Sequence, residues 1–363
     1  MYKITRYPET TNKSLQVSSA ADDYLLSYLQ KQDFPKANLA IVNDRFGYLA
    51  CHLNEWNPYS IIAFKSQEKA LRMNFKVNSL EIHEDHLLSP FDDYPDKLGL
   101  ALVKVPKSVD LFRLYLNQIN KASQKDTIVV CAFMTKYFSK QLLKISEEYF
   151  EEVEQSLAWK KSRLLILKKP KPVSEISLIT SIKLDESSEL QQYAGVFSAK
   201  NIDYATQFLI DNIQLKESEH EILDLASGNG IIALSIGNKY KQKNWQDPQL
   251  HLIDDSFLAV ESSKLNLPKD TTYFHYDDDL EGFENKSFDL VVSNPPFHFD
   301  YEINTEVTMD FFEQVFLVLK NGGRFVLVFN RHLRYNTLLK RIFSRVNVVA
   351  DSPKFIVMEC SKG

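Results

Sequence analysis

The tetrapeptide Asn294-Pro295-Pro296-Phe297 carries the side chains with the clearest capacity for chemistry. It follows the apolar run Phe288 to Val292, and proline both lacks an N–H group and disfavours helical geometry in the residue before it. We therefore expect Asn294 on a stiff loop at the carboxyl end of a buried strand, where open α/β sheets bind ligands. The Asn294 carboxamide oxygen and the Pro295 carbonyl are acceptors, and Phe297 offers a flat apolar face. This combination suits a planar group that carries an NH2, although a proline-terminated surface turn also fits.

A glycine-containing turn upstream is the second candidate for binding chemistry. Asp224 ends a predicted strand, and Gly228 and Gly230 follow it just before the next predicted helix. Glycines let a ligand approach the backbone closely, and the N–H groups of a helix N-terminus point towards it. The spacing also fits the dinucleotide-binding pattern, with an acid, Asp254, about twenty residues further on. The glycines alone therefore leave both NAD and S-adenosylmethionine open.

Two features favour S-adenosylmethionine over NAD. An acid at Asp224 would repel a pyrophosphate but suits a cationic amino-acid group, and an Asn-Pro-Pro-aromatic loop has no evident part in hydride transfer. The next strand ends also carry acids. Asp254 is expected to accept hydrogen bonds from ribose hydroxyls, and Asp277 or Asp278 from the adenine amine. Each acid alone could be a helix cap, but acids at three consecutive strand ends indicate a cofactor site.

The chain alternates strands and helices in both halves, which predicts an α/β fold with a parallel sheet and right-handed crossovers in each. The segment Lys168-Lys169-Pro170-Lys171-Pro172 is typical of a stiff linker, and we place the boundary there, giving domains 1–172 and 173–363. The first domain has Lys104-Val105-Pro106-Lys107 where the second has Asn-Pro-Pro-Phe, and no glycine-rich turn follows its first strand. It is predicted to keep the layout of a ligand-binding domain without the residues that hold a ligand.

The composition is that of an ordinary soluble globular protein, with 44% hydrophobic and 25% charged residues among 363. The net charge of -5 argues against a general nucleic-acid coat but permits a local basic patch.

Cys51, Cys131 and Cys360 lack C-x-x-C spacing and predict reduced thiols, while His83 and His86 are interpreted as surface residues, so we expect no metal site. No apolar run approaches the roughly 18 residues of a membrane span. We expect a cytoplasmic monomer.

Together, these motifs resemble a known enzyme family. The second domain is similar to class I S-adenosylmethionine-dependent methyltransferases. Its loop, with Gly195-Val196-Phe197-Ser198, resembles the ribosomal RNA guanine-N2 methyltransferases, which pair a degenerate first copy of the fold with an active second copy. Four further segments resemble the enzyme of large-subunit rRNA more than its small-subunit relative: Ile41 to Gly47, Lys104 to Lys107, Leu157 to Arg163 and Asn330 to Leu333. The resemblance implies two tandem methyltransferase-like domains, the first with an RNA-binding or structural role.

The resemblance also implies direct methyl transfer to a guanine N2 amine in 23S ribosomal RNA. Asn294 and the Pro295 carbonyl would accept hydrogen bonds from the NH2 and favour a pyramidal nitrogen. Positioning and electrostatics would then carry most of the rate. Phe297 would stack on the base, worth about 1–3 kcal/mol. Phe197 is expected either to wall the base pocket or to lie in the core.

The turn departs from the family pattern at one point. Ala226-Ser227 stands where the family usually has Gly-Cys, and alanine can keep the turn if its φ is negative. We expect the change to affect cofactor affinity and not the fold. Three alternatives stay open: a small-subunit rRNA enzyme, a protein glutamine methyltransferase, whose similar loop usually has Tyr after the prolines, and a non-catalytic RNA-binding assembly protein.

Two charge runs complete the sequence. The acidic run Glu147 to Glu154 is interpreted as a solvated helix end. The stretch Lys320 to Ala350 contains seven basic residues and no acid, which predicts RNA contact with a salt-dependent affinity, or else an ordinary exposed strand and helix. The residues predicted to bind ribosomal RNA are Arg331, Arg334, Lys340 and Arg341.

Overall fold

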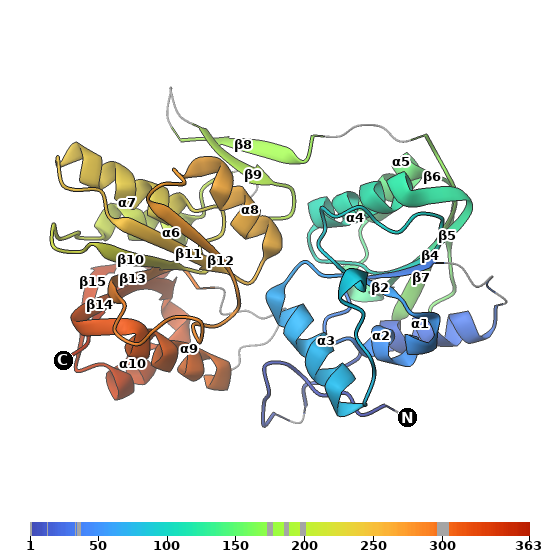
Figure 1. The fold of residues 1–363 in the computed structure, drawn as a ribbon, viewed down its shortest axis with the longest axis horizontal. Helices are drawn as coiled ribbons and strands as arrows, with labels where there is room; N and C mark the ends of the chain where they lie inside the picture. Colours follow the sequence, from blue (N-terminus) through green and yellow to red (C-terminus); the bar gives the residue numbers. More distant parts are fainter. Residues whose placement is uncertain are drawn as a thin grey trace. The chain divides into compact units, whose positions relative to one another are not determined.

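The computed structural model describes residues 2–12, 14–32, 34, 38–172, 177–184, 189–196, 201–295 and 305–363, with the backbone alone at 305–307. The chain forms two compact units, Met1–Leu178 and Ile179–Gly363, each containing one seven-stranded sheet (Figure 1). The boundary was expected near residue 172, and the units divide between Leu178 and Ile179. Within the described ranges, no helix has the length and apolar character needed to span a membrane.

The second unit is built on a sheet with the strand order β12-β11-β10-β13-β14-β16-β15. The first five of these strands pair in parallel, and β16 pairs antiparallel with both β14 and β15. The strands are β10 (Glu221–Leu225), β11 (Gln249–Asp254), β12 (Thr272–Tyr276), β13 (Phe288–Ser293), β14 (Leu319–Asn330), β15 (Arg345–Asp351) and β16 (Phe355–Ser361). The helices are α6 (Tyr204–Asn212), α7 (Ile231–Gln242), α8 (Phe257–Asn266), α9 (Thr305–Val318), α10 (Asn336–Ile342) and the 3-10 helix η4 (Arg331–Leu333).

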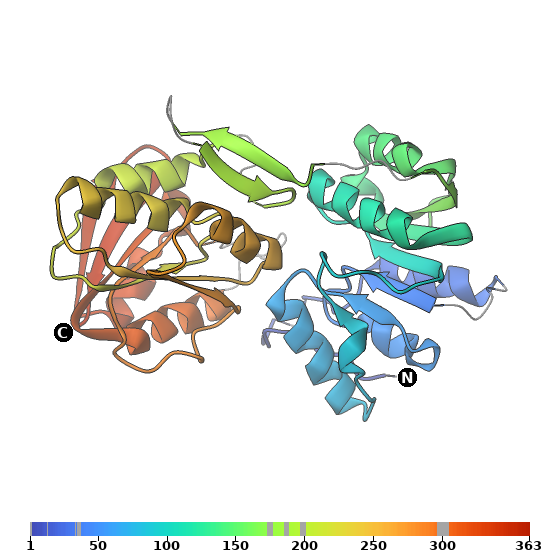
Figure 2. The ribbon, with the colours of Figure 1, turned by 45° about the horizontal axis from the view of Figure 1, so that its top comes forward.

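Helices cover both faces of this sheet, as Figure 2 shows. Because successive residues of a strand point to opposite faces, Leu290 and Val292 of β13 pack with α6 and α7, whereas Val291 packs with α9 and α10. This accounts for the continuous apolar run in β13, a strand buried on both sides. The loop after β13 is therefore held by a rigid strand.

The first unit repeats the arrangement, with the strand order β3-β2-β1-β4-β5-β7-β6. Its strands are β1 (Asn38–Val42), β2 (Tyr59–Ile61), β3 (Leu87–Leu88), β4 (Leu98–Lys104), β5 (Ser123–Met134), β6 (Phe150–Gln155) and β7 (Ser162–Pro170). Its helices are α1 (Ala20–Gln30), α2 (Tyr48–His52), α3 (Lys65–Val77), α4 (Val109–Ala122), α5 (Lys140–Tyr149) and the 3-10 helices η1 (Asn54–Trp56), η2 (Glu84–His86) and η3 (Thr135–Tyr137). The prediction of two tandem α/β domains is confirmed, because the strands of the two sheets follow the same spatial order relative to the chain.

A short hairpin, β8 (Ile179–Lys183) with β9 (Glu189–Tyr193), precedes the second sheet. The backbone of Tyr193 donates to Ser262 Oγ in α8 at 2.9 Å, so β9 is fixed to the outside of that helix. Gln192 Oε1 accepts from Asn229 Nδ2 at 2.6 Å. The hairpin therefore also supports the glycine turn after β10.

Two interpretations of charge runs need correction. Glu147 and Glu148 lie at the exposed end of helix α5, as predicted, but α5 ends at Tyr149. The later acids, Glu151, Glu152 and Glu154, lie on β6, an edge strand of the sheet and not a helix end. Lys168 and Lys169 lie on β7 and not in a linker. They form ion pairs with Glu154 and Glu152 across the strands. Charged side chains on an edge strand oppose pairing with the strands of other chains. In sequence, such an edge strand is as polar as the exposed surface of a helix, which explains the wrong assignment.

Arg324, in the middle of β14, is the largest fully buried side chain among the described residues, with 2% of its surface exposed. Its guanidinium donates to both carboxylate oxygens of Glu219, at 2.5 and 3.0 Å, and to Glu359 at 2.6 Å. It also donates to the carbonyl of Gln214. This cluster joins β14 and β16 to the loop before β10, so Arg324 serves the fold and is not available to RNA.

We predict that Arg324→Ala lowers the free energy of unfolding of the second unit by about 3–5 kcal/mol, because Glu219 is left buried without its partner. The exposed Arg345, at the same edge of the sheet, is the matched control, and Arg345→Ala should change stability by less than about 0.5 kcal/mol. Urea unfolding of both variants measures the difference. Equal, small effects would show that the buried cluster contributes nothing to stability.

Candidate functional site

The predicted site residues gather at one edge of the second sheet. In the parallel registers, Leu225 lies beside Ser293 on one side and beside Ile253 on the other, and Asp254 lies beside Tyr276. The turn after β10, the acids after β11 and β12 and the loop after β13 therefore share the carboxyl edge. In doubly wound sheets, this is where the crevice for a ligand lies.

The turn after β10 holds three residues in the left-handed region: Ala226 (φ 59°), Gly228 (φ 57°) and Gly230 (φ 80°). A Cβ on Gly228 would meet nothing within 4 Å, so this glycine faces open space, as a ligand-approach position should. A Cβ on Gly230 would lie 2.8 Å from Leu267 Cδ1. Gly230 therefore permits close packing of the turn against Leu267, and its role in cofactor binding stays a prediction.

Ala226 corrects a second expectation. The prediction made its fit conditional on a negative φ, and its φ is 59°. An L-residue in this region costs roughly 1–2 kcal/mol, which the family's usual glycine avoids. The turn keeps its shape because neighbouring bonds hold it: Ser227 N donates to the Ile253 carbonyl at 3.1 Å, and Gly230 N to the Ser227 carbonyl at 2.9 Å. The departure thus carries a cost in stability.

Asp224 is a deeply buried acid at the carboxyl end of β10. It is 1% exposed, and its Oδ2 accepts from the N–H of Ala233 in the first turn of α7 at 3.0 Å. Among the described residues, nothing hydrogen-bonds to its Oδ1 or to the buried Oγ of Ser227. The pKa of Asp224 is raised to about 8, chiefly by burial and also by the Asp254 charge, while the hydrogen bond from the Ala233 N–H lowers it. Two buried polar atoms without partners at one turn indicate a polar ligand.

Asp254 closes the opposite side of the turn. Its Oδ2 accepts from Gly228 N at 2.9 Å and its Oδ1 from Ser256 N at 2.8 Å. Burial raises the pKa of Asp254, and these two N–H groups lower it. Each oxygen retains a second lone pair, so the fixed carboxylate can still accept from hydroxyl groups.

Asp277 and Asp278 follow β12 and are half-buried. The Asp278 N–H donates to Asp277 Oδ1 at 2.9 Å. Together with Asp279, they are the one group of three or more acids, Cys or His in the described ranges whose ligand atoms all lie within 4.8 Å of one another. The cluster is an acidic turn at the cofactor edge of the sheet.

The amide of Asn294 has a defined orientation. Its Nδ2 donates to Thr206 Oγ1 at 2.8 Å and to Asp203 Oδ2 at 3.1 Å. Both N–H groups are thereby used, which leaves Oδ1, next to the buried Pro295, as the amide atom that can accept a hydrogen bond. Pro296, Phe297 and Phe197 lie outside the described residues.

The partners of Asn294 are the functional residues that sequence reasoning missed. Asp203 is the N-cap of α6, with Oδ2 accepting from Ala205 N at 3.0 Å and Thr206 N at 3.2 Å. An Asp before a helical pattern signals a cap, so this first role was detectable. Its second role, and that of the 7% exposed Thr206, depend on the packing of α6 against the end of β13.

The first unit has an equivalent corner, where the end of β4 meets the N-terminus of α1, but its side chains differ. Val42 of β1 pairs with Val103 as Leu225 pairs with Ser293, so Lys104 occupies the position of Asn294. Lys104 Nζ donates to Ser19 Oγ, the α1 N-cap, at 3.1 Å and forms an ion pair with Asp22 three residues on. These contacts repeat, position for position, those of Asn294 with Asp203 and Thr206. A lysine side chain has no acceptor, so Lys104 cannot accept a hydrogen bond from an amine as the oxygen of Asn294 can.

The turn after β1 is likewise closed by the chain itself. Asn43 (φ 63°) and Gly47 (φ 67°) stand where Ala226 and Gly230 stand in the second unit. Between them, Asp44 accepts from Tyr48 N at 3.1 Å and Ala50 N at 3.0 Å, which caps α2. Burial raises the pKa of Asp44 to about 7. The helix N–H groups that could meet a ligand are therefore already paired.

The basic stretch is less uniform than its sequence suggests. Besides the buried Arg324, Lys320 Nζ lies 2.9 Å from Asp289 Oδ1, and Arg331 pairs with Asp351, an acid just beyond the stretch. Arg334, Lys340 and Arg341 are exposed, and none of them forms an ion pair within the described part of the chain.

Strand direction separates the four predicted RNA-binding residues. Arg331 and Arg334 follow the carboxyl end of β14, beside the loop of Asn294. Lys340 and Arg341 lie in the last turn of α10, which leads back to β15 at the opposite edge. The structure therefore brings the first two towards the site and not the second two.

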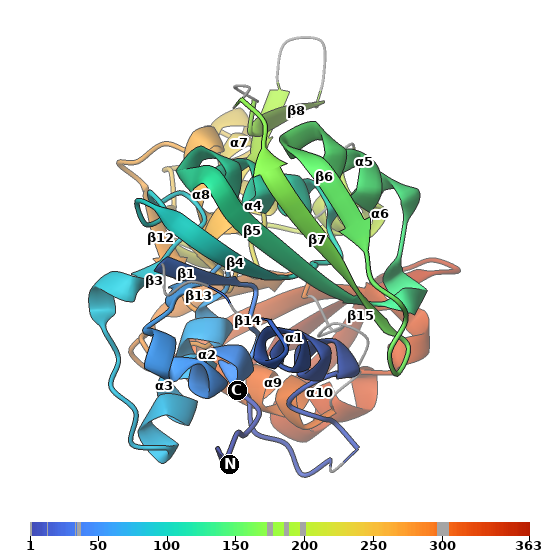
Figure 3. The same ribbon diagram turned by 90° about the vertical axis from the view of Figure 1, so that its right-hand side faces the viewer.

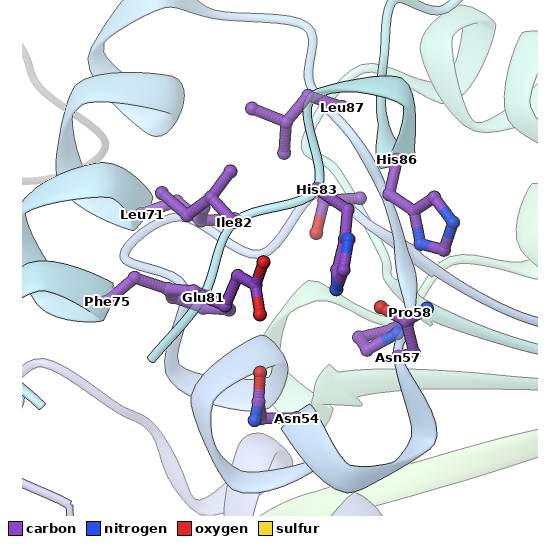
Figure 4. A pocket seen from close by; sticks show the side chains of 11 residues that line it. Asn54, Asn57, Pro58, Leu71, Phe75, Glu81, Ile82, His83, His86 and Leu87 are labelled. Atoms are coloured by element: carbon purple, nitrogen blue, oxygen red, sulfur yellow. The ribbon is translucent and has the colours of Figure 1, made fainter. Parts of the chain in front are cut away.

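A small pocket in the first unit involves the two histidines of the sequence analysis (Figure 4). Its volume is about 20 Å³, room for about one water molecule. His83 is exposed, as predicted, but His86 is half-buried, with its ring stacked 3.8 Å from that of Tyr59. The surface interpretation therefore holds for His83 alone.

Comparison with known proteins gives matches along nearly the whole chain. Residues 1–172 match the family model of the RLMG N-terminal domain, and residues 187–359 match that of the methyltransferase small domain. The chain is 30% identical to ribosomal RNA large subunit methyltransferase G of Psychromonas ingrahamii and 31% identical to that of Vibrio vulnificus. Each alignment covers 99% of this chain and 96% of the relative.

Among solved structures, the chain resembles that of a 16S rRNA N2 methyltransferase (RsmC) of T. thermophilus in complex with AdoMet and guanosine. The TM-score is 0.78, and the match covers 95% of this chain and 92% of that chain. The sequence identity is 20%, so this likeness supports the fold.

We predict that Ala226→Gly increases the free energy of unfolding by roughly 0.5–1 kcal/mol, because glycine adopts φ 59° without the Cβ penalty. Ala259→Gly, within α8, is the matched control and should lose about 1 kcal/mol. Urea unfolding without ligand measures both. Destabilisation by both changes would show that the turn tolerates alanine without strain.

A second prediction concerns Asp224. Its pKa of about 8 in the folded protein lies far above the ordinary value of 3.8, so the folded state binds more protons than the unfolded state between those pH values. Stability of the ligand-free protein therefore falls as pH rises through this window, by up to about 1.4 kcal/mol per pH unit. Asp224→Asn should remove this loss, becoming progressively more stable than wild type from pH 5 to pH 8.5.

Thermal unfolding at pH 5, 6.5 and 8.5 measures the difference between the two proteins. The contribution of Asp44 is common to both and cancels. Parallel pH profiles for wild type and Asp224→Asn would contradict the assignment of the raised pKa to Asp224.

Proposed function

Since this chain belongs to the ribosomal RNA large subunit methyltransferase G family, we propose that it methylates the exocyclic N2 amine of a guanine in large-subunit (23S) ribosomal RNA. The observation that carries this proposal is the orientation of the Asn294 amide, whose N–H groups are used by Asp203 and Thr206. Its Oδ1 is therefore the group that a substrate amine meets. The T. thermophilus enzyme of the same fold, an rRNA N2 methyltransferase solved with guanosine, favours guanine N2 as the acceptor.

The residues at the carboxyl edge fit S-adenosylmethionine, which when bound supplies an electrophilic methyl group. The unpartnered Oδ1 of Asp224 would hold the cationic amino group, and the open side of Gly228 leaves room for the ligand against the backbone. Asp254 would accept from the ribose hydroxyls, and Asp277 or Asp278 from the adenine amine. Ala226 shapes the turn without contributing a polar group.

The acceptor side rests on Asn294 and the Pro295 carbonyl. Two hydrogen bonds from the N2 amine to these oxygens favour a pyramidal nitrogen with its lone pair free to react. The base must leave its helix to reach them. We propose that Pro296 stiffens this loop, that Phe297 stacks on the base and that Phe197 walls the pocket. No general base is needed before transfer, because the methylated nitrogen is cationic and then loses its acidic N–H proton to water. Positioning and electrostatics therefore supply most of the rate.

We propose that residues 173–363 form the catalytic domain and that residues 1–172 bind RNA or support the fold. The Lys104–Asp22 ion pair in place of an acceptor supports a non-catalytic first domain. Arg331 and Arg334 are proposed to meet RNA phosphates beside the site, with Lys340 and Arg341 as more distant contacts. A ribosomal RNA substrate implies a cytoplasmic enzyme, which we propose acts as a monomer.

The activity is tested with labelled S-adenosylmethionine and protein-free 23S rRNA that lacks this modification. Label should appear in N2-methylguanine after digestion to nucleosides and mass spectrometry. Asn294→Ala should retain S-adenosylmethionine binding and lose turnover. Absence of labelled N2-methylguanine at every salt concentration would overturn the proposal, and label in another nucleoside would correct the acceptor.

The orientation of Asn294 gives a sharper prediction. Thr206→Val keeps the shape of the side chain but removes the acceptor, which should lower kcat about 10- to 100-fold, equivalent to about 1–3 kcal/mol, as Asn294 loses its fixed position. Thr206→Ser keeps the hydroxyl and should stay within about threefold of wild type. The Kd for S-adenosylmethionine should not change in either variant.

A double-mutant cycle separates positioning from a merely structural effect. In an Asn294→Ala background, Thr206→Val should cause little further loss, because the amide that it positions is gone. An equal loss in both backgrounds would show that Thr206 acts on stability and not through Asn294.

A further inference from the structure

The first unit carries a basic and aromatic surface at the carboxyl end of β5 and the amino end of β7. These two strands are antiparallel neighbours (Figure 3). It consists of residues 134–140, which include η3, and residues 156–163, which form the hairpin between β6 and β7. We call it the hairpin surface. Thr135 joins its two segments, since its N–H and Oγ1 donate to the Lys161 carbonyl at 2.8 and 3.1 Å. The segments contain five cations, Lys136, Lys140, Lys160, Lys161 and Arg163, and no acid.

Large apolar side chains are exposed on the same surface. Leu157 is 87% exposed, Phe138 37% and Tyr137 36%. Cations lie over the rings: Lys160 Nζ is 4.5 Å from the Trp159 ring centroid, and Lys136 Nζ is 4.6 Å from that of Tyr137. Exposed apolar groups that gather together mark an interaction site more often than isolated ones do.

The tip of the hairpin places two lysines where the backbone disfavours them. Trp159 and Ser162 exchange both backbone hydrogen bonds, at 2.8 and 2.9 Å, so Lys160 and Lys161 form a two-residue turn. Their φ angles are 46° and 63°, the geometry of a type I′ turn, which strongly prefers Asn-Gly. Two L-side chains in this region cost roughly 1–2 kcal/mol each. Strain that packing does not require points to function.

The hairpin is held firmly enough to present these side chains. The Tyr24 hydroxyl donates to the Leu157 carbonyl at 3.0 Å, and the Tyr24 ring lies 5.5 Å from that of Trp159. Helix α1 therefore supports the underside of the hairpin while Leu157 and the two lysines project outward.

We propose that the hairpin surface binds single-stranded RNA, with phosphates at Lys160 and Lys161 and bases against Leu157, Trp159 and Phe138. Cations without acids, interleaved with aromatic faces, form the combination that holds a strand without reading its sequence. A protein partner fits less well, because lysine is depleted at protein interfaces. The choice of RNA rests on the proposed function, and the surface lies apart from the methyl-transfer residues in the chain.

The double change Lys160→Asn with Lys161→Gly tests the surface, because it removes both charges and gives the turn its preferred residues. The variant should unfold at a higher temperature than wild type and yet bind RNA about tenfold more weakly at 100 mM KCl. The probe is a fluorescein-labelled 20-nucleotide oligouridylate, measured by anisotropy with the full chain. The slope of log K against log salt should fall by about 1.4, since each single-strand phosphate contributes about 0.7.

Matched variants make the outcome decisive. Lys121→Gln with Lys125→Gln removes two exposed charges at the other edge of the same sheet and should leave affinity and slope unchanged. Leu157→Ala should weaken binding about threefold or more with the slope unchanged. Unchanged RNA binding in the hairpin variant would overturn the inference and leave a protein partner as the occupant of the surface.

The experiments distinguish a failure of the proposed methyltransferase function from a failure of the proposed RNA-binding surface. S-adenosylmethionine binding should be intact in the hairpin variant, and oligouridylate binding should be intact in Asn294→Ala. RNA binding that depends on the hairpin, without methylation by wild type, would reject the activity alone. Methylation with no hairpin dependence of RNA affinity would reject the surface alone.

Discussion

The fixed orientation of one amide is the constraint on which the site depends. A carboxamide can donate or accept, and only its oxygen can hold a substrate NH2. Asp203, as a carboxylate, and Thr206, through its hydroxyl oxygen, take both N–H groups of Asn294. Since both partners lie in the first turn of α6, the packing of this helix on the sheet determines which face of the amide a ligand meets. The helix cap and the acceptor are one hydrogen-bonded unit.

The first unit shows that this corner of the fold needs polar groups whatever its function. A helix N-terminus meets the end of a buried strand there, and both leave backbone groups to be paired. Lys104 with Ser19 and Asp22 satisfies this need as completely as Asn294 with its two partners. The exchange of an amide for an ammonium group removes the amide oxygen that could accept from an amine. One substitution of this kind changes whether the residue at the end of the strand offers an acceptor or a donor.

The sequence predicted those features whose cause is local. Strands that end in acids or in Asn-Pro-Pro follow apolar runs, so the tandem α/β fold, the cofactor and the family were recognisable, and all three are confirmed. Features set by distant residues were not predictable. Asp203 lies far from Asn294 in the chain, Arg324 is buried by Glu219 and Glu359, and the φ of Ala226 depends on the neighbouring strand. The acids of β6 were misassigned because a polar edge strand and a helix surface have similar composition.

Ala226 and the hairpin tip at Lys160 and Lys161 both have L-residues with a strained, left-handed backbone, and they differ in what the side chain contributes. At Ala226 the side chain offers no charge or hydrogen bond, so the positive φ is a cost that the surrounding turn absorbs. At Lys160 and Lys161 the same backbone geometry displays two cations beside exposed apolar side chains. Because glycine or asparagine would serve the turn better at either place, backbone needs explain neither choice. Of these two places, the hairpin is the one where the side chains themselves supply a reason for the strained residues, namely charge that a nucleic acid can use.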